Sequence, residues 1–223
     1  PKPSSAASDV YKRQPFMKKS GISFKTIIEM VKNGQEEELA KKCPLHEVVL
    51  DMIVKHLPSP IEAQKYRIEK IWKGDINSEV GKDMISVNPD GRLAAVVTKM
   101  VPDPHAGFVS CVRIFSGKIR KGQEVYLVGQ HKTQRVQQVS VYKGPQRIQV
   151  DEVTAGNIAG IVGLTDAFSG ETLCQPDHII EPFEEIRHLF EPVVTKAIEP
   201  KNPKDLSKLI EFLKKLSRED TTI

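Results

Sequence analysis

The chain has 223 residues, of which 39% are hydrophobic and 28% are charged, with a formal net charge of +4. This length predicts one or two domains with buried cores. Its three cysteines, Cys43, Cys111 and Cys174, are widely spaced and form no Cys-x-x-Cys pair, which disfavours a disulfide framework or a zinc site. No apolar run approaches the ~20 residues of a membrane span, and no signal peptide is visible. We therefore expect a cytoplasmic protein with no membrane partner.

The charge is distributed unevenly along the chain. Residues 113–147 contain eight Lys or Arg and one acid, a net charge of +7, whereas residues 151–186 contain eight Asp or Glu and no Lys or Arg, a net charge of −8. A compact segment with such a positive charge favours a polyanion, and RNA is the commonest in the cytosol. The alternative is a solvated charged surface without a partner.

The first 57 residues predict a tail followed by helices. Residues 1–14 are rich in Pro, Ser and Ala and resemble translated sequencing-adapter read-through, so we expect a non-native tail; a genuine disordered tail is the alternative. Apolar residues at helical spacing follow Ser23, a plausible N-cap, and Gly34 ends that helix. Residues 35–42 predict a short helix, and Pro44 suits the first position of a third. These amphipathic helices need a sheet to cover, which indicates a larger domain upstream.

The middle of the chain predicts a connecting arm and then a barrel. Residues 61–75, after the helix stop at Pro58-Ser59-Pro60, are interpreted as an extended polar arm, and Asn88-Pro89-Asp90-Gly91 is a strong turn signal. Strand-like runs then follow one another with no helix between them, which predicts a closed or nearly closed antiparallel barrel. The runs are 93–101, 108–115, 124–128, 134–143, 148–153, 157–163 and a last corner and strand within 167–173.

One corner of this barrel carries three cations. Gly117 and Gly122 bracket a short turn that contains Lys118, Arg120 and Lys121. Glycine permits φ > 0 at such corners without a Cβ clash. The sequence therefore predicts a rigid tip that displays positive charge to an acidic partner.

The last segment predicts the front half of a small α+β domain. Residues 192–198 are expected to form a strand, residues 202–205 a turn and cap, and an apolar stripe from Leu206 to Leu216 a helix.

Motifs for catalysis or metal binding are incomplete. His46-Glu47 begins the HExxH zinc motif, but position 50 is Leu, so the second ligand is missing. Asp103 and His105 lie in a Pro- and Gly-punctuated segment that we interpret as a loop. The sequence contains no phosphate loop of the GxxxxGK[ST] type and no GxSxG elbow. No catalytic, cofactor-binding or metal-ligating residue is predicted.

Four long segments in the same order resemble the translation elongation factor 2 family, most closely its archaeal form. The resemblance covers residues 15–223 and implies an internal fragment of mixed fold. It implies that residues 15–89 are the C-terminal helices of a P-loop GTPase domain with its linker, residues 90–178 the β-barrel second domain, and residues 179–223 the start of a split βαβ third domain. The segments are Pro44–Asp75, Phe115–Gly129, Ala155–Leu173 and Pro192–Asp205.

That family drives GTP-dependent movement of tRNA and mRNA through the ribosome. The resemblance implies that this part docks on ribosomal RNA and relays the nucleotide state of a missing GTPase domain in cis, with no DNA partner. Phosphate contacts would position the barrel rather than read sequence. We expect the acidic stretch after Asp151 to face away from the RNA, because like charges repel. The candidate contacts are Lys118, Arg120, Lys121, Lys132 and Arg135.

Three other interpretations remain open. One is another translational GTPase of the release, ribosome-protection or spliceosomal type. A second is a free-standing RNA-binding barrel, which the helices of residues 16–57 disfavour because they need a sheet. The third is a metal hydrolase, which lacks its ligands.

The sequence lacks the motifs that bind and hydrolyse GTP. GTP and Mg²⁺ are cofactors of the intact family protein, but its phosphate loop, switch regions and guanine motif have no counterpart in this sequence. We expect the 223-residue chain not to hydrolyse GTP, even with added ribosomes, in a phosphate-release assay. Ribosome-stimulated turnover by the purified chain would contradict this.

Overall fold

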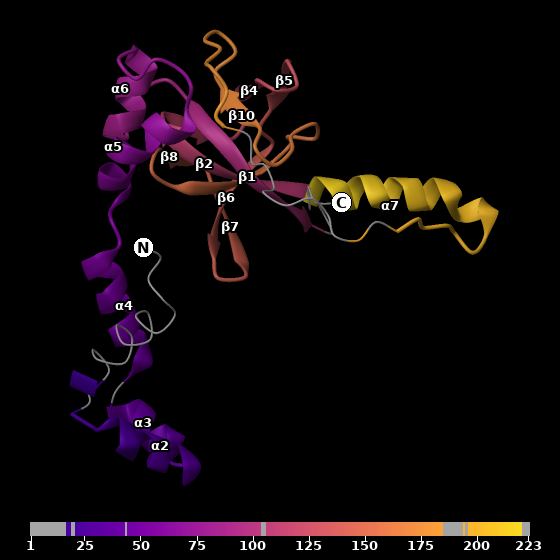
Figure 1. Cartoon of the computed structure of the whole chain (residues 1–223). Helices are drawn as coiled ribbons and strands as arrows, with labels where there is room; N and C mark the ends of the chain where they lie inside the picture. Colours follow the sequence, from indigo (N-terminus) through magenta and orange to yellow (C-terminus); the bar gives the residue numbers. More distant parts are fainter. Residues whose placement is uncertain are drawn as a thin grey trace. The chain divides into compact units, whose positions relative to one another are not determined.

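The computed structural model describes residues 17–18, 21–42, 44–103, 106–184, 194 and 196–219 (Figure 1). The tail expected at residues 1–14 lies outside them. The chain divides into two compact units, Pro1–Pro58 and Ser59–Ile223.

The described residues of the first unit include the helices α2 (Phe24–Lys32), α3 (Glu36–Lys42) and α4 (Leu45–His56). The predicted N-cap is confirmed, because Ser23 Oγ accepts a hydrogen bond from the Thr26 amide at 3.2 Å. Pro44 is the N-cap of α4 rather than its first helical residue.

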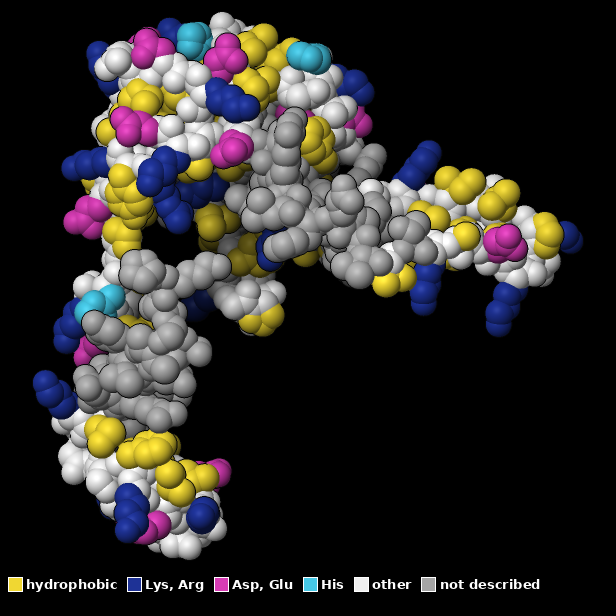
Figure 2. All heavy atoms as spheres, viewed as in Figure 1, with side chains coloured by type: hydrophobic (Ala, Val, Ile, Leu, Met, Phe, Trp, Pro, Cys, Tyr) yellow, Lys and Arg dark blue, Asp and Glu magenta, His cyan; other side chains and the backbone are white. Residues whose placement is uncertain are grey.

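The apolar faces of these helices are open to solvent within their own unit. Phe24 and Ile28 on α2 are each 41% exposed, and Val54 on α4 is 82% exposed. Figure 2 shows hydrophobic side chains on the surface of these helices. An amphipathic helix gains most of its stability by burying such a face, so this unit is incomplete as a folded core in the part of the chain that the structure describes.

The segment predicted as an extended arm is helical instead. It forms α5 (Pro60–Ile71), followed by α6 (Glu79–Ser86). Ser59 and Glu62 form a capping box: Ser59 Oγ accepts from the Glu62 amide at 3.3 Å, and the Glu62 carboxylate accepts from the Ser59 amide at 3.0 Å. Pro60 occupies the first helical position, where its missing N–H is not needed. The prolines that end α4 therefore also begin α5.

The ten described strands form two antiparallel groups. An eight-stranded sheet has the order β5-β4-β10-β1-β2-β9-β6-β7, and β3 pairs separately with β8. The strands are β1 (Ala94–Asp103), β2 (Gly107–Ser116), β3 (Lys118–Arg120), β4 (Glu124–Leu127), β5 (Lys132–Arg135), β6 (Gln138–Lys143), β7 (Gln146–Val150), β8 (Glu152–Thr154), β9 (Ile158–Val162) and β10 (Thr172–Cys174).

One apolar core unites these strands. It contains side chains from both groups, including Val112 and Ile161 of the sheet and Ile119 and Val153 of the β3–β8 pair. The predicted antiparallel, sheet-rich part is thus confirmed, whereas its bounds, residues 90–178, stay a prediction. Two predicted strands are each divided in the structure: residues 134–143 into β5 and β6, and residues 148–153 into β7 and β8. The segment predicted as a turn at Lys118 to Arg120 is the short strand β3.

The predicted closure of the barrel is wrong, because β5 and β7 lie at the two edges of the sheet and do not pair with each other. Val136 and Gln137 connect the edge strand β5 to β6, which lies next to the other edge strand. The Val136 amide donates to Gln123 O at 2.9 Å, before β4, whereas the Gln137 amide donates to Val162 O at 2.8 Å, on β9. Neither acceptor lies on an edge strand, so these two hydrogen bonds do not join β5 to β7.

The third predicted part is described only in fragments. The helix is confirmed as α7 (Leu206–Glu219), which follows a 3₁₀ turn at Pro203–Asp205. The strand predicted at residues 192–198 is not formed at Val194 or at residues 196–198, and its other positions lie outside the described residues. The start of a split βαβ domain therefore rests on the helix alone.

Helices α5 and α6 pack on the sheet through a second apolar cluster. Ile68, Trp72 and Met84 from the helices lie among residues of the sheet and its C-terminal extension. The Trp72 indole donates to Glu181 O at 2.7 Å. The sheet side of the cluster includes Ala94, Phe115, Cys174, Ile180 and Phe183.

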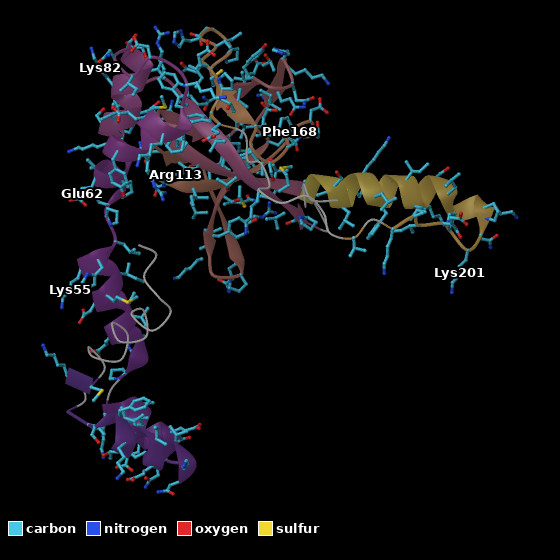
Figure 3. All side chains as sticks on the ribbon, viewed as in Figure 1. Lys55, Glu62, Lys82, Arg113, Phe168 and Lys201 are labelled. Atoms are coloured by element: carbon cyan, nitrogen blue, oxygen red, sulfur yellow. The ribbon has the colours of Figure 1, made fainter. Side chains whose placement is uncertain are left out.

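A buried amide fixes the position of the helices on the sheet. Gln64 on α5 is only 2% exposed, and its Nε2 donates to Met84 O on α6 and to Phe115 O on β2, the latter at 3.0 Å. Its Oε1 accepts from Arg113 Nη2 at 3.2 Å. Arg113 also donates to Gly156 O and lies 5.8 Å from the centre of the Phe115 ring. In Figure 3, Arg113 lies between the helices and the sheet.

Replacing this amide should destabilise the unit. In Gln64→Leu, Met84 O, Phe115 O and one guanidinium nitrogen of Arg113 lose the hydrogen bonds that Gln64 makes, so we expect a loss of about 3 kcal/mol in the free energy of unfolding. Urea unfolding followed by the fluorescence of Trp72, the one tryptophan of the chain, measures it. The control is Gln146→Leu at an exposed position of β7, with an expected change within about 0.5 kcal/mol. Equal stability of the two variants would contradict the role of Gln64.

Candidate nucleic-acid interface

The basic corner is built on the short pair β3–β8. Lys118 lies opposite Thr154, Ile119 opposite Val153, and Arg120 opposite Glu152. Side chains alternate along a strand, so Ile119, which is fully buried, enters the core while its two basic neighbours lie on the other face. Gly117 and Gly122 flank the strand with φ of +73° and +82°. A Cβ on Gly117 would lie 2.9 Å from the backbone of Leu93, so only glycine fits this corner.

Two of the candidate cations are held by carboxylates. Lys118 Nζ lies 2.8 Å from Asp90, and Arg120 Nε lies 2.6 Å from Glu152. The hydrogen bonds to these cations lower the pKa of both carboxyl groups. Both pairs are largely exposed, so they orient the side chains more than they stabilise the fold.

The other candidates differ in their surroundings. Lys132 Nζ pairs with Asp166 at 2.9 Å, beside the loop before β10. Arg135 Nε donates to Gly122 O at 3.1 Å and so fastens the turn after β3. Lys121 is exposed and has no ion-pair partner among the residues that the structure describes, although its amide donates to Asp151 O at 3.1 Å.

These contacts show which candidates share one site. Arg135 reaches the turn that contains Lys121, so the structure brings Lys118, Arg120, Lys121 and Arg135 to the same corner. Lys132 lies opposite Leu127, three residue pairs from the Glu124–Arg135 pair along the β4–β5 ladder, at the far end of that hairpin.

The basic and acidic segments meet in the fold, whereas the expectation that the acidic stretch faces away from RNA stays a prediction. Glu152 and Asp166 both belong to the acidic stretch, and each pairs with a cation of the basic segment. Antiparallel pairing of β3 with β8 places the two stretches side by side, although they are some thirty residues apart in sequence. The local charge at the corner is therefore smaller than the +7 of the segment suggests.

Sequence reasoning missed a buried acid that shapes the β4–β5 turn. Glu171 is 1% exposed, and its Oε1 accepts from the Gly129 amide at 2.6 Å. Its Oε2 is buried without a hydrogen-bond partner in the described part of the structure. Burial raises the pKa of Glu171, and the Gly129 hydrogen bond opposes this. The local sequence Ser169-Gly170-Glu171 gave no signal, because it resembles an ordinary polar loop.

The described residues hold no metal cluster. They include no group of three or more His, Cys, Asp or Glu side chains placed to bind an ion. Asp103 has a structural role, because it pairs with Arg147 at 3.3 Å and accepts from the Ala106 amide at 2.9 Å; His105 lies outside the described residues. No described helix has both the length and the apolar character that a membrane crossing requires.

Comparison with known proteins shows which sequences this chain resembles. Residues 107–174, which contain most of the sheet and the corner, match the family model "Elongation factor Tu domain 2". Elongation factor 2 of Methanocaldococcus jannaschii is 60% identical over 209 residues, 94% of this chain and 29% of the relative. By sequence, this chain is thus similar to archaeal elongation factor 2 over 94% of its length.

Other archaeal elongation factor 2 proteins are similar to this chain over the same length. The proteins of Archaeoglobus fulgidus and Methanopyrus kandleri are each 54% identical over 209 residues, which cover 29% and 17% of their own lengths. The chain thus spans less than a third of the length of these archaeal relatives. The resemblance to archaeal elongation factor 2 is confirmed over nearly the whole chain.

Glu171 should make the stability of the fold depend on pH. Its folded pKa lies above the usual 4.5, so its favourable contribution is complete below that pH and is lost as the pH rises through the folded pKa. Glu171→Gln cannot titrate. We therefore expect the stability of the unmodified chain, relative to the variant, to fall as the pH rises from about 4 to neutral. Urea unfolding of both proteins across this range measures it, and parallel profiles would contradict the assignment.

Proposed function

We propose that this chain is the ribosome-docking part of an elongation factor 2 that promotes GTP-dependent translocation of tRNA and mRNA. The observation that carries the proposal is a glycine-bounded basic corner within a sequence that is 60% identical to an elongation factor 2. The corner binds phosphates of ribosomal RNA through Lys118, Arg120, Lys121 and Arg135, and Lys132 extends the contact along the β4–β5 hairpin.

The ion pairs of the corner suit this role. Asp90 and Glu152 hold Lys118 and Arg120 in fixed positions, at 2.8 and 2.6 Å. A bound phosphate would replace a carboxylate as the partner, so little side-chain entropy is lost on docking. Lys121 contributes its charge without such an exchange, and phosphate contacts of this kind fix the orientation of the protein without reading sequence.

The second element of the proposal is the relay to a GTPase domain in cis. Helices α5 and α6 are attached to the sheet by the Gln64 network and by the Trp72 cluster. A motion that displaced these helices would therefore move the basic corner with them as one body. GTP and Mg²⁺ belong to the GTPase domain of the intact factor, which acts in the cytoplasm.

Another translational GTPase and a free-standing RNA-binding barrel are the remaining alternatives. The similar proteins of M. jannaschii and A. fulgidus are both named elongation factor 2, which argues against another translational GTPase. The exposed apolar faces of α2 and α4 argue against the second, because they need a covering surface.

Neutral substitutions at the corner test docking. We expect Lys121→Gln to weaken binding of the chain to small ribosomal subunits of M. jannaschii and to reduce the slope of log affinity against log salt by about one. The triple variant with Lys118→Gln and Arg120→Gln added should bind still more weakly. Sedimentation binding at several salt concentrations measures both quantities.

The matched control is Lys201→Gln, an exposed lysine outside the sheet (Figure 3), which should leave both quantities unchanged. Reversing Lys118, Arg120 and Lys121 to Glu should abolish binding, but it also sets like charges against Asp90 and Glu152. The neutral variants therefore decide the question: unchanged affinity and slope in the triple Gln variant would remove the corner from the interface.

A further inference from the structure

A small polar hollow opens beside the unpaired cation of the corner. It has a volume of about 150 Å³ and is lined by Lys121, Gln138, Val139, Gln149, Val150 and Asp151. Gln138 and Val139 come from β6 and Gln149 and Val150 from β7, two strands that form a hairpin projecting from the sheet (Figure 1). The hydrogen bond from the Lys121 amide to Asp151 O, at 3.1 Å, fastens the corner to the end of this hairpin.

The two glutamines present unused hydrogen-bonding groups at the hollow. Gln149 Nε2 donates to Gln138 Oε1 at 3.1 Å. This bond uses one donor and one acceptor, so a donor remains on Gln138 Nε2 and an acceptor on Gln149 Oε1. A neighbouring donor and acceptor of this kind are complementary to the edge of a nucleobase.

The size of the hollow limits what it can hold. A cavity of about 150 Å³ accommodates a single six-membered ring such as benzene. Pockets for larger ligands begin at about 300 Å³. The hollow is therefore large enough for one ring of a base and too small for a complete nucleotide such as GTP.

The charges at the hollow favour a base within a polynucleotide over a free anion as the ligand. Lys121 attracts phosphate, but Asp151, which also lines the hollow, carries a negative charge that opposes binding of a free anion there. Asp151 can instead accept a hydrogen bond from an N–H group of a base. A polynucleotide satisfies both groups, because it carries a base and a phosphate next to each other.

We propose that this hollow receives one unstacked base of ribosomal RNA while Lys121 contacts a neighbouring phosphate. The proposal rests on the docking function proposed above and adds a base contact to it. Proteins commonly recognise folded RNA through bases that have left the stack in loops and bulges. Here the Gln138–Gln149 pair would hydrogen-bond the edge of the base.

The test removes the amides without changing charge. In the full chain, Gln138→Leu/Gln149→Leu should lower the affinity for M. jannaschii small subunits about tenfold, because the base loses its hydrogen-bond partners. The slope of log affinity against log salt should stay the same, because no cation is removed. Base-specific chemical probing of the RNA should show a base that the unmodified chain protects and the double variant does not.

Gln146→Leu is the matched control, since it makes the same change on β7 outside the lining of the hollow. It should keep the affinity and every protection, and urea unfolding of all variants checks that each is folded. Loss of the same protection in Gln146→Leu would overturn the assignment of the hollow.

Two further outcomes separate the proposals. If the unmodified chain binds with a steep salt dependence and the double variant keeps its affinity and protections, the hollow is not a base site, while the docking function stands. If the unmodified chain does not bind small subunits even at low salt, both proposals are overturned.

Discussion

The second unit depends on one buried amide. The apolar cluster around Trp72 holds α5 and α6 against the sheet, but apolar contact is not directional and would tolerate a shift along the sheet. Gln64 removes that freedom, because its Nε2 must reach Met84 O and Phe115 O while its Oε1 receives Arg113. Leaving these buried groups without partners costs more than their bonds contribute, so the network acts mainly by excluding other arrangements. The position of the helices thus follows from directional hydrogen bonds that Gln64 makes to both helix and sheet.

Local sequence was sufficient to predict most helices and strands. It was insufficient to predict where they end and which strands pair. The cap of α2, the α7 stripe and the main strands were predictable, because periodicity and capping act within a few residues. Helix α5 was missed because Pro58 and Pro60 were interpreted only as the end of the preceding helix. Ser59 and Glu62 nevertheless have the spacing of a capping box. Barrel closure was predicted wrongly because it depends on whether β5 pairs with β7, and local sequence does not show which strands become the edges of the sheet.

In the candidate site, too, some features could be predicted from the sequence and others only from the fold. Two glycines around three cations identify the corner in the sequence. They do not show which cations form ion pairs with carboxylates. That depends on Asp90, Glu152 and Asp166, which the fold brings from distant positions. Glu171 and the hollow beside Lys121 were also invisible, since each is formed by strands that meet only in three dimensions.

Under the proposed docking function, compensated charge also changes what kind of RNA surface this corner suits. A bare patch of +7 would bind any polyanion, whereas here a phosphate must compete with Asp90 and Glu152 for Lys118 and Arg120. Only a surface that offers phosphates at several of these cations at once can win that competition, because each single exchange of a carboxylate for a phosphate gains little. Ion pairs that weaken general binding therefore favour a folded RNA with fixed phosphate positions over a flexible strand. A corner of this kind gains selectivity for the shape of its partner at the expense of affinity.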